Sequence, residues 1–327
     1  MKRQLAVSIE AFPLREAFVI SRGAKTQAVT VTVRLTAGGS RAQGECIPYP
    51  RYGETPEGVA AAIESVRSAI ESGCTREELQ DLLPAGAARN ALDCAIWDAE
   101  AKRLGLRAHV LAGLHRLPPA VTAFTISAGS PEAMAAAARR HADKPVLKIK
   151  LAGDGDAERI AAVRSAAPAC EMIADANEAW REDQVEKLLA ACAAAHVGLV
   201  EQPLPAGADA CLAEIPHPVP VCADESVHTC AELAGLRKRY DAVNIKLDKT
   251  GGLTEALAMV RRAQELGFAV MVGSMVGTSL SMAPAMLLTP FARWTDLDGP
   301  LLLARDREPG LRYDGCTIQP PDAALWG

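Results

Sequence analysis

Short apolar runs that each end in charged residues are the feature that most constrains the fold of this chain. The runs read PVLKIK, EMIADAN, VGLVEQP, VPVCADE and AVNIKL, and helix-like sequence follows them. Their terminal charges recur every 22 to 26 residues, at Lys150, Asp175, Glu201, Asp224 and Lys246. Runs of this kind are typical of parallel strands that are buried on both faces. A strand with its helix and loops takes roughly 20 to 30 residues, and the C-terminal strand ends of a barrel meet on one face, so we predict a (β/α) barrel with these charges in one pocket.

Composition narrows the class of protein further. Nearly half of the 327 residues are apolar, which allows a large core, and the net charge of −5 comes without a basic stripe. Phosphate binding needs clustered lysine and arginine, so no nucleic-acid partner is expected. No apolar run is long enough to span a bilayer and no signal peptide is recognisable, so we predict a cytoplasmic protein without a membrane partner. The nine cysteines are scattered without a CxxC spacing, which indicates reduced thiols.

The first 115 residues have a different pattern from the rest of the chain. Residues 29–35, VTVTVRL, alternate as a strand does and are followed by the turn AGGS and a second strand, which predicts a hairpin. Residues 55–73 predict a helix that opens with threonine and proline and ends at glycine. We therefore predict an α+β unit over residues 1–115, ahead of the barrel.

The predicted barrel is a modified TIM barrel, (β/α)7β, over residues 116–300. Its first strand should lie in VTAFTIS, residues 121–127, and its last in RWTDLDGP, residues 293–300. The tail, residues 301–327, is too short to be a domain and too strand-like to be a disordered end. We expect it to return to the N-terminal unit and complete it.

Three of the strand-end charges are carboxylates: Asp175, Glu201 and Asp224. Like charges brought within a few ångströms repel each other, and a divalent cation between them removes that penalty. Oxygen ligands without cysteine or histidine favour Mg²⁺ over Zn²⁺, and three protein ligands leave octahedral positions for water or substrate. Any one of these acids alone is more simply explained as a helix cap or a partner of a lysine. Three in register with the barrel period predict a Mg²⁺ site.

Lysines supply the other strand-end charges. Lys148 and Lys150 lie two positions apart on one strand and project to the same side, while Lys246 lies on a strand across the barrel. A nearby cation and neighbouring lysines disfavour the charged ammonium, so we expect the lysine pKa values to fall toward the range useful for proton transfer. A lone KIK is commonly a solvated strand edge. Its pairing with Lys246 favours Lys148, Lys150 and Lys246 as catalytic residues.

A metal with a base on either side indicates removal of a proton next to a carboxylate. Mg²⁺ would bind the carboxylate oxygens of the substrate and stabilise the enediolate that forms. With Lys150 on one face of the carbon and Lys246 on the other, a proton taken from one side can be replaced on the other, which inverts the carbon. These residues therefore predict racemisation or epimerisation by 1,1-proton transfer.

The charged motifs resemble those of the enolase superfamily, in its muconate-lactonising subgroup. The shared motifs are KIK at 148–150, DAN at 175–177, EQP at 201–203, DES at 224–226 and NIK at 244–246. The resemblance covers nearly the whole chain. It implies that the α+β unit is a capping domain that closes over the barrel, and that Mg²⁺ and a lysine base act at the site. The ordered set of motifs is highly specific for the superfamily and less specific for the reaction.

Acids of the last predicted strand bear on the substrate. Asp296 and Asp298 are two apart and can together hold a substrate ammonium group, although an Asp-Gly turn with helix-capping acids explains them as well. The pair resembles the one that dipeptide epimerases use for the amino terminus of the dipeptide. By the same resemblance, Arg22 reaches the side-chain carboxylate of a glutamyl substrate, with a surface salt bridge as the alternative.

Other substrate contacts are predicted around the barrel mouth. Ser274 and Met275 end the seventh strand, where similar enzymes bind substrate largely through the main chain. Thr125 on the first strand and Lys148 on the second are also expected to contact substrate. The segment IPYPRYGE, residues 47–54, looks like the second capping loop of the family, which shields the pocket and from which Arg51 can contact substrate. Glu225, next to Asp224, should point away from the metal if its strand stays regular.

The leading hypothesis is a Mg²⁺-dependent epimerase of dipeptides that inverts the C-terminal residue, with L-Ala-D-Glu and L-Ala-L-Glu as the pair. By resemblance it would serve the recycling of cell-wall (murein) peptides. One alternative keeps the mechanism in an N-acyl amino acid racemase, an o-succinylbenzoate synthase or a cycloisomerase, but Asp296 and Asp298 would repel an acidic acyl group. Another is a catalytically silent relative that binds a metal, although every base and ligand is present. The expected partner is a small-molecule dipeptide, and no feature of the sequence identifies an oligomer interface.

Overall fold

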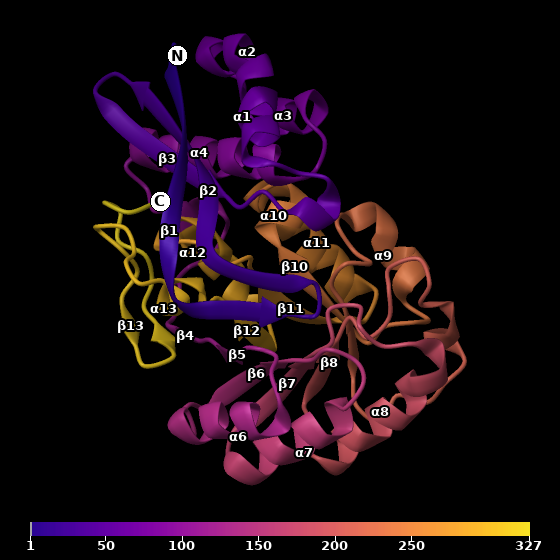
Figure 1. Cartoon of the computed structure of the whole chain (residues 1–327). Coiled ribbons are helices and arrows are strands. Elements are labelled where there is room, and N and C mark those ends of the chain that lie inside the picture. Colours follow the sequence, from indigo (N-terminus) through magenta and orange to yellow (C-terminus); the bar gives the residue numbers. More distant parts are fainter. Residues whose placement is uncertain (1) are drawn as a thin grey trace.

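The computed structural model describes residues 2–327 as a mainly antiparallel and helical cap on a barrel of parallel strands. Figure 1 shows the N-terminal strands and helices on one side of the barrel, with the C-terminal tail running back beside the first strands. Among the described residues, no helix is long and apolar enough to cross a lipid bilayer. The predicted combination of an α+β unit and a (β/α)7β barrel is confirmed.

The cap begins with a three-stranded antiparallel sheet. Its strands are β1 (Gln4–Ile20), β2 (Gly23–Ala37) and β3 (Ser40–Cys46). Val31, Val33 and Leu35 of β2 are buried on one face, because every second side chain of a strand points the same way. The hairpin predicted around AGGS is therefore confirmed, and its apolar face forms the core of the cap.

The far end of the β1–β2 hairpin leaves this sheet and reaches the barrel. Pairing is interrupted between Pro13 and Phe18 and resumes with Phe18 opposite Lys25. Irregularities of this kind bend a strand. The main-chain N–H of Ala128, which follows the first barrel strand, donates to the Val19 carbonyl at 3.0 Å. The bend and this bond place the hairpin tip over the barrel, as Figure 1 shows.

Helices cover one face of the cap sheet. They are α1 (Pro56–Ser65), α2 (Arg67–Ser72), α3 (Arg76–Leu82), α4 (Ala87–Leu104) and α5 (Ala108–Leu111). The side chain of Thr55 caps α1 by accepting from the N–H of Gly58. The single helix predicted over residues 55–73 is wrong in one respect, because it breaks at Val66 with φ −104° and ψ 8°. Beyond the break, Arg67 donates to the Leu5 carbonyl, which turns α2 toward β1.

Eight parallel strands form the barrel. They are β5 (Phe124–Ile126), β6 (Val146–Lys150), β7 (Glu171–Asp175), β8 (Leu199–Glu201), β9 (Val221–Ala223), β10 (Ala242–Lys246), β11 (Ala269–Gly273) and β12 (Trp294–Asp296). A main-chain hydrogen bond from Ala123 to Thr295, 2.8 Å long, joins the first edge to the last. Inside, apolar side chains such as Ile173, Leu199 and Met271 pack against one another. The interior is thus a packed core that holds the strand ends in place.

Helices and short elements surround the barrel. The helices are α6 (Pro131–Arg140), α7 (Asp156–Ala166), α8 (Glu182–Ala194), α9 (Cys230–Leu236), α10 (Leu247–Thr250), α11 (Leu253–Glu265), α12 (Ser279–Ala285) and α13 (Gly299–Leu302). Single 3-10 turns are η1 (Pro50–Tyr52), η2 (Ala210–Ala213) and η3 (Met286–Phe291). Only η2 separates β8 from β9, so that connection is the least helical of the barrel.

The first and last barrel strands are shorter than predicted. The predicted strand over 121–127 is divided, because β4 (Ala120–Val121) pairs instead with β14 (Thr317–Ile318) of the tail. The last strand ends at Asp296, since the next residues turn into α13, and Pro300 at the start of that helix has no N–H for a strand ladder. The sheet therefore stops where the predicted acid pair begins.

Polar contacts join the cap to the barrel. Arg89 of α4 donates to the Thr250 carbonyl at 2.7 Å, just beyond β10. The carboxylate of Asp248 accepts from Asn90 of α4 and from the N–H of Ile47. The segment 47–54, which the sequence predicted as a capping loop, therefore starts at a point fixed directly to the end of β10.

The tail packs on the cap. Leu303 forms an isolated bridge with Leu14 of β1, and the indole of Trp326 donates to the Cys94 carbonyl of α4 at 3.0 Å. Arg307 forms ion pairs with Glu10 and Glu45, which belong to β1 and β3. A second small sheet, in which β13 (Tyr313–Asp314) and β14 pair with β4, ties the same tail to the start of the barrel.

Candidate active site

Three carboxylates lie buried at the ends of neighbouring barrel strands. Asp175 is the last residue of β7 and Glu201 the last residue of β8, and the strand register places them opposite each other. Asp224 follows β9 directly and is buried as well. The barrel period has therefore brought together the three acids that the sequence predicted as metal ligands.

Lysine ammonium groups lie between these carboxylates. Lys148 Nζ is 2.7 Å from Glu201 Oε2 and 3.1 Å from Asp175 Oδ2. Lys246 Nζ is 2.5 Å from Asp224 Oδ2 and 3.8 Å from Glu201 Oε1. The carboxylates are thus close enough to share cations, and two lysines balance part of their charge.

Burial and ion pairing act in opposite directions on the pKa values of this cluster. Burial raises the pKa of Asp175, but three neighbouring lysines outweigh it and hold that pKa below its usual range. Burial and the charge of Asp175 raise the pKa of Glu201 to about 7. Burial lowers the pKa of Lys246, but Asp224 and Glu201 outweigh it and raise the value. The predicted lowering of the lysine pKa depends on a bound cation and stays a prediction, while the protein groups alone raise the pKa of Lys246 because carboxylates dominate its surroundings.

The chemistry of the donor set fits a hard divalent cation. Buried carboxylate oxygens without cysteine or histidine are the ligands that Mg²⁺ prefers. As the side chains stand, no three acidic, histidine or cysteine side chains of residues 2–327 surround one point closely enough to hold an ion. Lys148 and Lys246 lie between the carboxylates and pair with some of their oxygens. The assignment of Asp175, Glu201 and Asp224 as metal ligands stays a prediction.

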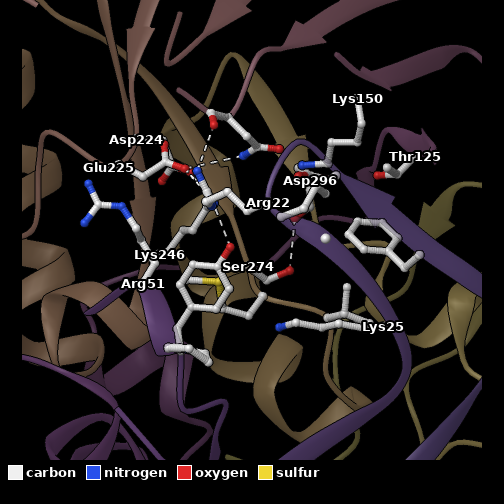
Figure 2. Close-up of a pocket in the computed structure, with 18 of the residues that line it drawn as sticks. Arg22, Lys25, Arg51, Thr125, Lys150, Asp224, Glu225, Lys246, Ser274 and Asp296 are labelled. Atoms are coloured by element: carbon white, nitrogen blue, oxygen red, sulfur yellow. Dashed lines mark hydrogen bonds and ion pairs between the residues drawn. The ribbon is translucent and has the colours of Figure 1, made fainter. Parts of the chain in front are cut away.

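Lys150 and Lys246 reach one cavity from different strands. The cavity has a volume of about 390 Å³, and both lysines line it. Lys150 comes from β6 and Lys246 from β10, four strands away in the sheet. Figure 2 shows their side chains entering the cavity from different sides. Phe18 of the hairpin covers Lys150, with its ring centroid 5.8 Å from Nζ. A carbon atom between these two lysines would be accessible to a base on either face.

Lys148 lies apart from the residues that line the cavity. Its side chain is fully buried, and its ammonium contacts three carboxylates, the third being Asp296 Oδ2 at 2.6 Å. Burial alone would lower the pKa of Lys148, but the three acids outweigh this effect and raise the pKa well above its usual value. The structure therefore gives Lys148 the position of a charge that holds several acids together beneath the cavity.

The predicted acid pair at the end of the barrel does line the cavity. Asp296 Oδ1 is buried and has no hydrogen-bond partner among residues 2–327, which leaves one acceptor free. The carboxylate of Asp298 accepts from the N–H of Thr125 at 2.7 Å. Burial and the charge of Asp296 raise the pKa of Asp298 to about 7. The placement of both acids on the last strand is wrong for Asp298, because β12 ends at Asp296 and Asp298 stands directly before α13, where its side chain makes no capping bond.

The remaining barrel residues predicted to bind substrate lie at the same mouth. Thr125 of β5, Ser274 and Met275 all line the cavity. Ser274 and Met275 follow β11 directly, as predicted. The Ser274 hydroxyl donates to the Asp296 carbonyl at 3.2 Å, so its side chain ties β11 to β12. Because this bond occupies the Ser274 hydroxyl, main-chain groups remain to bind a substrate here, in line with the prediction.

Arg22 lies on the cap side of the cavity, between β1 and β2. One guanidinium nitrogen is 2.7 Å from Glu225 Oε1 and 3.0 Å from the Tyr49 hydroxyl. The other donates to the Asn177 carbonyl at 2.8 Å and to Glu178 at 3.1 Å. Figure 2 shows Arg22 beside Glu225 and Asp224. The arginine that was predicted to meet a substrate carboxylate therefore already has two protein carboxylates as partners.

Glu225 was predicted to point away from the metal if its strand stayed regular, and the strand does not extend that far. Glu225 lines the cavity and is buried, and Arg22 is its ion-pair partner. Side chains alternate only within a strand, and β9 ends at Ala223, two residues earlier. Burial and the neighbouring charge of Asp224 raise the pKa of Glu225. The sequence carries no signal for where β9 stops, so alternation does not place this acid.

The second capping loop uses the same barrel acids. Arg51 of η1 donates to both oxygens of Glu178, at 2.8 Å each, and it lines the cavity. Glu178 follows β7 with a positive φ of 67°, and Asn177 before it has a φ of 44°. Residues other than glycine rarely adopt this left-handed conformation, which concentrates at functional sites. The turn after Asp175 thus directs Glu178 toward both loops of the cap.

Two further residues support the acids, one in β10 and one in the short helix that follows it. Asn244 donates to Glu201 Oε1 at 2.7 Å, and Lys249 donates to Asp224 Oδ1 at 2.6 Å. Both are buried. Asn244 lies two positions before Lys246, so strand alternation alone places it on the same side and was sufficient to predict it. Lys249 lies in α10, beyond the strand, and no strand pattern indicates it.

The fold and this site together define a capped (β/α)-barrel protein of the enolase type, with acids and lysines at its strand ends. The model of the mandelate racemase / muconate lactonizing enzyme N-terminal domain matches residues 2–113, and that of the enolase C-terminal domain-like family matches residues 133–324. The chain therefore belongs to the mandelate racemase / muconate lactonizing enzyme family of the enolase superfamily, as the motifs predicted.

Curated relatives align over most of the chain. The L-Ala-D/L-Glu epimerase of Escherichia coli (strain K12) is 47% identical over 95% of this chain and 98% of its own length. The N-acetyl-D-glutamate racemase of a Pseudoalteromonas species is 42% identical over 86% of this chain and 90% of its own length. Both are named for reactions at a glutamyl residue.

Solved structures share the fold. An enolase family member from Agrobacterium tumefaciens, with homology to dipeptide epimerases and with bound sodium and L-Ala-L-Glu, is 53% identical with a TM-score of 0.98. The match covers 99% of this chain and 100% of that one. A dipeptide epimerase from Methylococcus capsulatus, complexed with Mg and L-Arg-D-Lys, is 31% identical with a TM-score of 0.91, over 98% of each chain.

Proposed function

We propose that this protein is a Mg²⁺-dependent epimerase of dipeptides, with L-Ala-D-Glu and L-Ala-L-Glu as its substrates. The observation that carries the proposal is the placement of Lys150 and Lys246, which enter one cavity from different sides beside buried carboxylates. The names of the curated relatives and the dipeptides bound in similar structures support this substrate class.

The two lysines would exchange protons with the α-carbon of the C-terminal residue. One lysine, as the neutral amine, takes the proton while the C–H bond breaks. The other, as the ammonium, gives its proton to the opposite face of the same carbon, which inverts the centre. The epimer formed is the substrate of the reverse reaction with the roles exchanged, so both lysines serve in both directions.

Asp175, Glu201 and Asp224 would hold the Mg²⁺ ion. When bound, Mg²⁺ supplies positive charge beside the α-carboxylate of the substrate, which stabilises the negative charge created by proton removal. Lys148 would keep the buried acids paired from beneath, and Asn244 would hold Glu201 in its orientation. Phe18 would limit the access of water to Lys150.

The ends of the dipeptide would be recognised by different walls of the cavity. The free acceptor of Asp296, together with Asp298, would bind the ammonium group of the first residue. Thr125, Ser274 and Met275 line the wall along which the peptide group would lie. Arg22 would face the side chain of the second residue from the hairpin.

The same catalytic groups would serve an N-acylated amino acid, as the Pseudoalteromonas relative illustrates. An N-acetyl group carries no charge, and it would leave the buried Asp296 Oδ1 without a hydrogen-bond donor. A buried acceptor without a partner is costly, so this site favours a free ammonium group.

Turnover of peptides released from the cell wall in the cytoplasm is the role that we propose for the activity.

Proton NMR of L-Ala-L-Glu and L-Ala-D-Glu in D₂O with purified protein and Mg²⁺ tests the function directly. We expect the glutamyl α-proton signal to disappear while the other epimer forms. N-acetyl-L-glutamate, measured in parallel, should react more slowly by about 10-fold or more, because one buried acceptor is left unpaired. Exchange of N-acetyl-L-glutamate but of no dipeptide would refute the proposed substrate and leave the family assignment unchanged.

A further inference from the structure

The least helical part of the barrel contains a buried polar network that the proposed mechanism does not use. Its members are Gln202, Asp209, Ser226 and Tyr240, which we call the Asp209 network. Gln202 and Asp209 are fully buried, and Tyr240 is 1% exposed. None of the four lines the active-site cavity. Every other barrel strand is followed by an α-helix, whereas β8 is followed only by η2, so buried hydrogen bonds contribute here what a helix supplies elsewhere.

The side chain of Gln202 is the centre of this network. Its Oε1 accepts from the main-chain N–H groups of Asp224 at 2.8 Å and Ser226 at 3.1 Å. Its two Nε2 protons are shared among the Leu204 carbonyl at 2.8 Å and the hydroxyls of Ser226 and Tyr240 at 2.9 Å each. Only an amide both accepts and donates in this way, because a carboxylate has no proton to give. Gln202 thus joins the end of β8 to the main chain of Asp224.

Asp209 determines the orientation of the Gln202 amide. Its Oδ2 accepts from the Tyr240 hydroxyl at 2.5 Å and from the Ser226 hydroxyl at 2.7 Å. Arg239 forms an ion pair with the same carboxylate, which compensates its buried charge. Because both hydroxyls give their protons to Asp209, they offer only lone pairs to Gln202, and the donor end of the amide must face them.

The main chain of Gln202 lies between two of the acids predicted to bind the cation. Gln202 follows Glu201 directly and has a positive φ of 33°, which residues other than glycine rarely adopt. Its carbonyl accepts from the N–H of Glu178 at 2.9 Å. Strained residues of this kind persist where their surroundings hold them, and they concentrate at functional sites. Gln202 therefore fixes Glu201 through the chain and Asp224 through its side chain.

We propose that Asp209, Tyr240 and Gln202 are positioning residues that act through Glu201 and Asp224 to set the affinity of the site for its divalent cation. This inference rests on the proposed function, since it takes these two acids as cation ligands. The network holds the main chain from which the Asp224 carboxylate projects. A shift there moves a charged ligand without removing it, so cation binding should weaken while the proton-transfer groups stay intact.

Binding of Mn²⁺ tests the proposal without relying on activity. Mn²⁺ has the charge of Mg²⁺ and also suits oxygen ligands, and the EPR signal of the free ion gives its Kd. Tyr240→Phe keeps the ring and removes the hydroxyl between Asp209 and Gln202, so it should raise the Kd by about 3-fold to 10-fold. Gln202→Met, which can neither accept nor donate at those positions, should raise it by about 10-fold to 100-fold.

Kinetics separate cation affinity from chemistry. At saturating Mn²⁺, Tyr240→Phe should epimerise L-Ala-L-Glu with a kcat within about threefold of the wild-type value, because the network does not reach the cavity. Tyr313→Phe is the matched control, since that hydroxyl donates to the Leu297 carbonyl at 2.8 Å and contacts no member of the network. It loses a hydrogen bond as well, but it should leave the Kd for Mn²⁺ unchanged.

The outcomes distinguish this inference from the proposed function. An unchanged Kd in folded Tyr240→Phe, an equal rise in Tyr313→Phe, or a kcat that stays low at saturating Mn²⁺ would overturn the assignment. If the variants weaken Mn²⁺ binding but the wild-type protein epimerises no dipeptide, the positioning role stands and the proposed function fails. If the wild-type protein itself binds no Mn²⁺, the ligand assignment fails and this inference fails with it.

Discussion

The barrel wall and the cap wall of the cavity are built in different ways. The barrel wall consists of strand ends whose side chains are buried, such as Lys246 with 7% of its side chain exposed. The cap wall consists of a hairpin tip and a short 3-10 turn, and its arginines are 26% exposed at Arg22 and 38% exposed at Arg51. The difference indicates a division of work. Groups for proton transfer are fixed by the sheet, while groups that meet the substrate side chain stand on elements that can change without disturbing the strands.

The strongest test of this division is the loss of a barrel lysine. Lys246→Ala or Lys150→Ala should lower kcat for epimerisation by about 10³-fold, because one of two proton-transfer groups is missing. The size of the effect should be the same for acidic and neutral dipeptides. Conversion of each epimer measured by NMR, with circular dichroism to verify folding, checks this. An activity above a tenth of the wild-type value would show that the lysine is not a base.

Removal of the metal, or of one of its predicted ligands, should have the next largest effect. Chelation by EDTA should abolish epimerisation and added Mg²⁺ should restore it. Asp224→Asn should lower the activity by about 10²-fold or more at a fixed Mg²⁺ concentration, since a charged oxygen ligand is lost. The activity is measured as a function of Mg²⁺ concentration, with the exposed Asp314→Asn as the matched control. Unchanged Mg²⁺ dependence in Asp224→Asn would contradict the ligand assignment.

Asp296 belongs to the barrel wall but is predicted to affect binding more than chemistry. Asp296→Asn should raise KM for L-Ala-L-Glu by about 10-fold to 100-fold, because the substrate ammonium loses a charged acceptor. The same change should reduce the difference in kcat/KM between L-Ala-L-Glu and N-acetyl-L-glutamate, because N-acetyl-L-glutamate does not need that acceptor. Initial rates on both substrates measure the ratio. If the ratio of kcat/KM values does not change, the ammonium group is bound elsewhere.

Arg51 should have the smallest effect of the four. Its side chain is 38% exposed, although its partner Glu178 is only 8% exposed, and ion pairs that solvent reaches from one side contribute modestly. Arg51→Met should change kcat/KM by about threefold or less, and equally for all dipeptides. A selective loss for acidic dipeptides would make Arg51 a determinant of the preferred side chain, and it would extend the recognition surface to the second capping loop.

The predictability of the site from sequence follows the same division. Asp175, Glu201 and the lysines were predicted because a barrel has a fixed period and parallel strands end on one face. A residue's position within a strand shows whether its side chain faces the site, and the same rule places Asn244 there. Beyond the strands the rule no longer applies, so the alternation considered for Glu225 does not hold and Asp298 was placed on the wrong element.

The cap residues could be predicted only in part. The hairpin over residues 29–46 and the helix caps follow from local patterns, but the break at Val66 depends on contacts of α2 with β1. Glu178 was not singled out at all, because its importance arises from its pairing with two arginines of the cap, Arg22 and Arg51. That property depends on the assembled molecule, and a single sequence does not contain it in any local form.

The pairing of Phe18 with Lys25 also has a consequence for how substrate range changes over evolutionary time. Side chains of β2 alternate between facing the cavity and facing solvent, so deletion of one residue near the hairpin tip would exchange the two sets at once. The strand ends of the barrel would stay where they are. A lineage can therefore acquire a new side-chain preference by a change in hairpin length alone, without a single substitution among the residues that move protons.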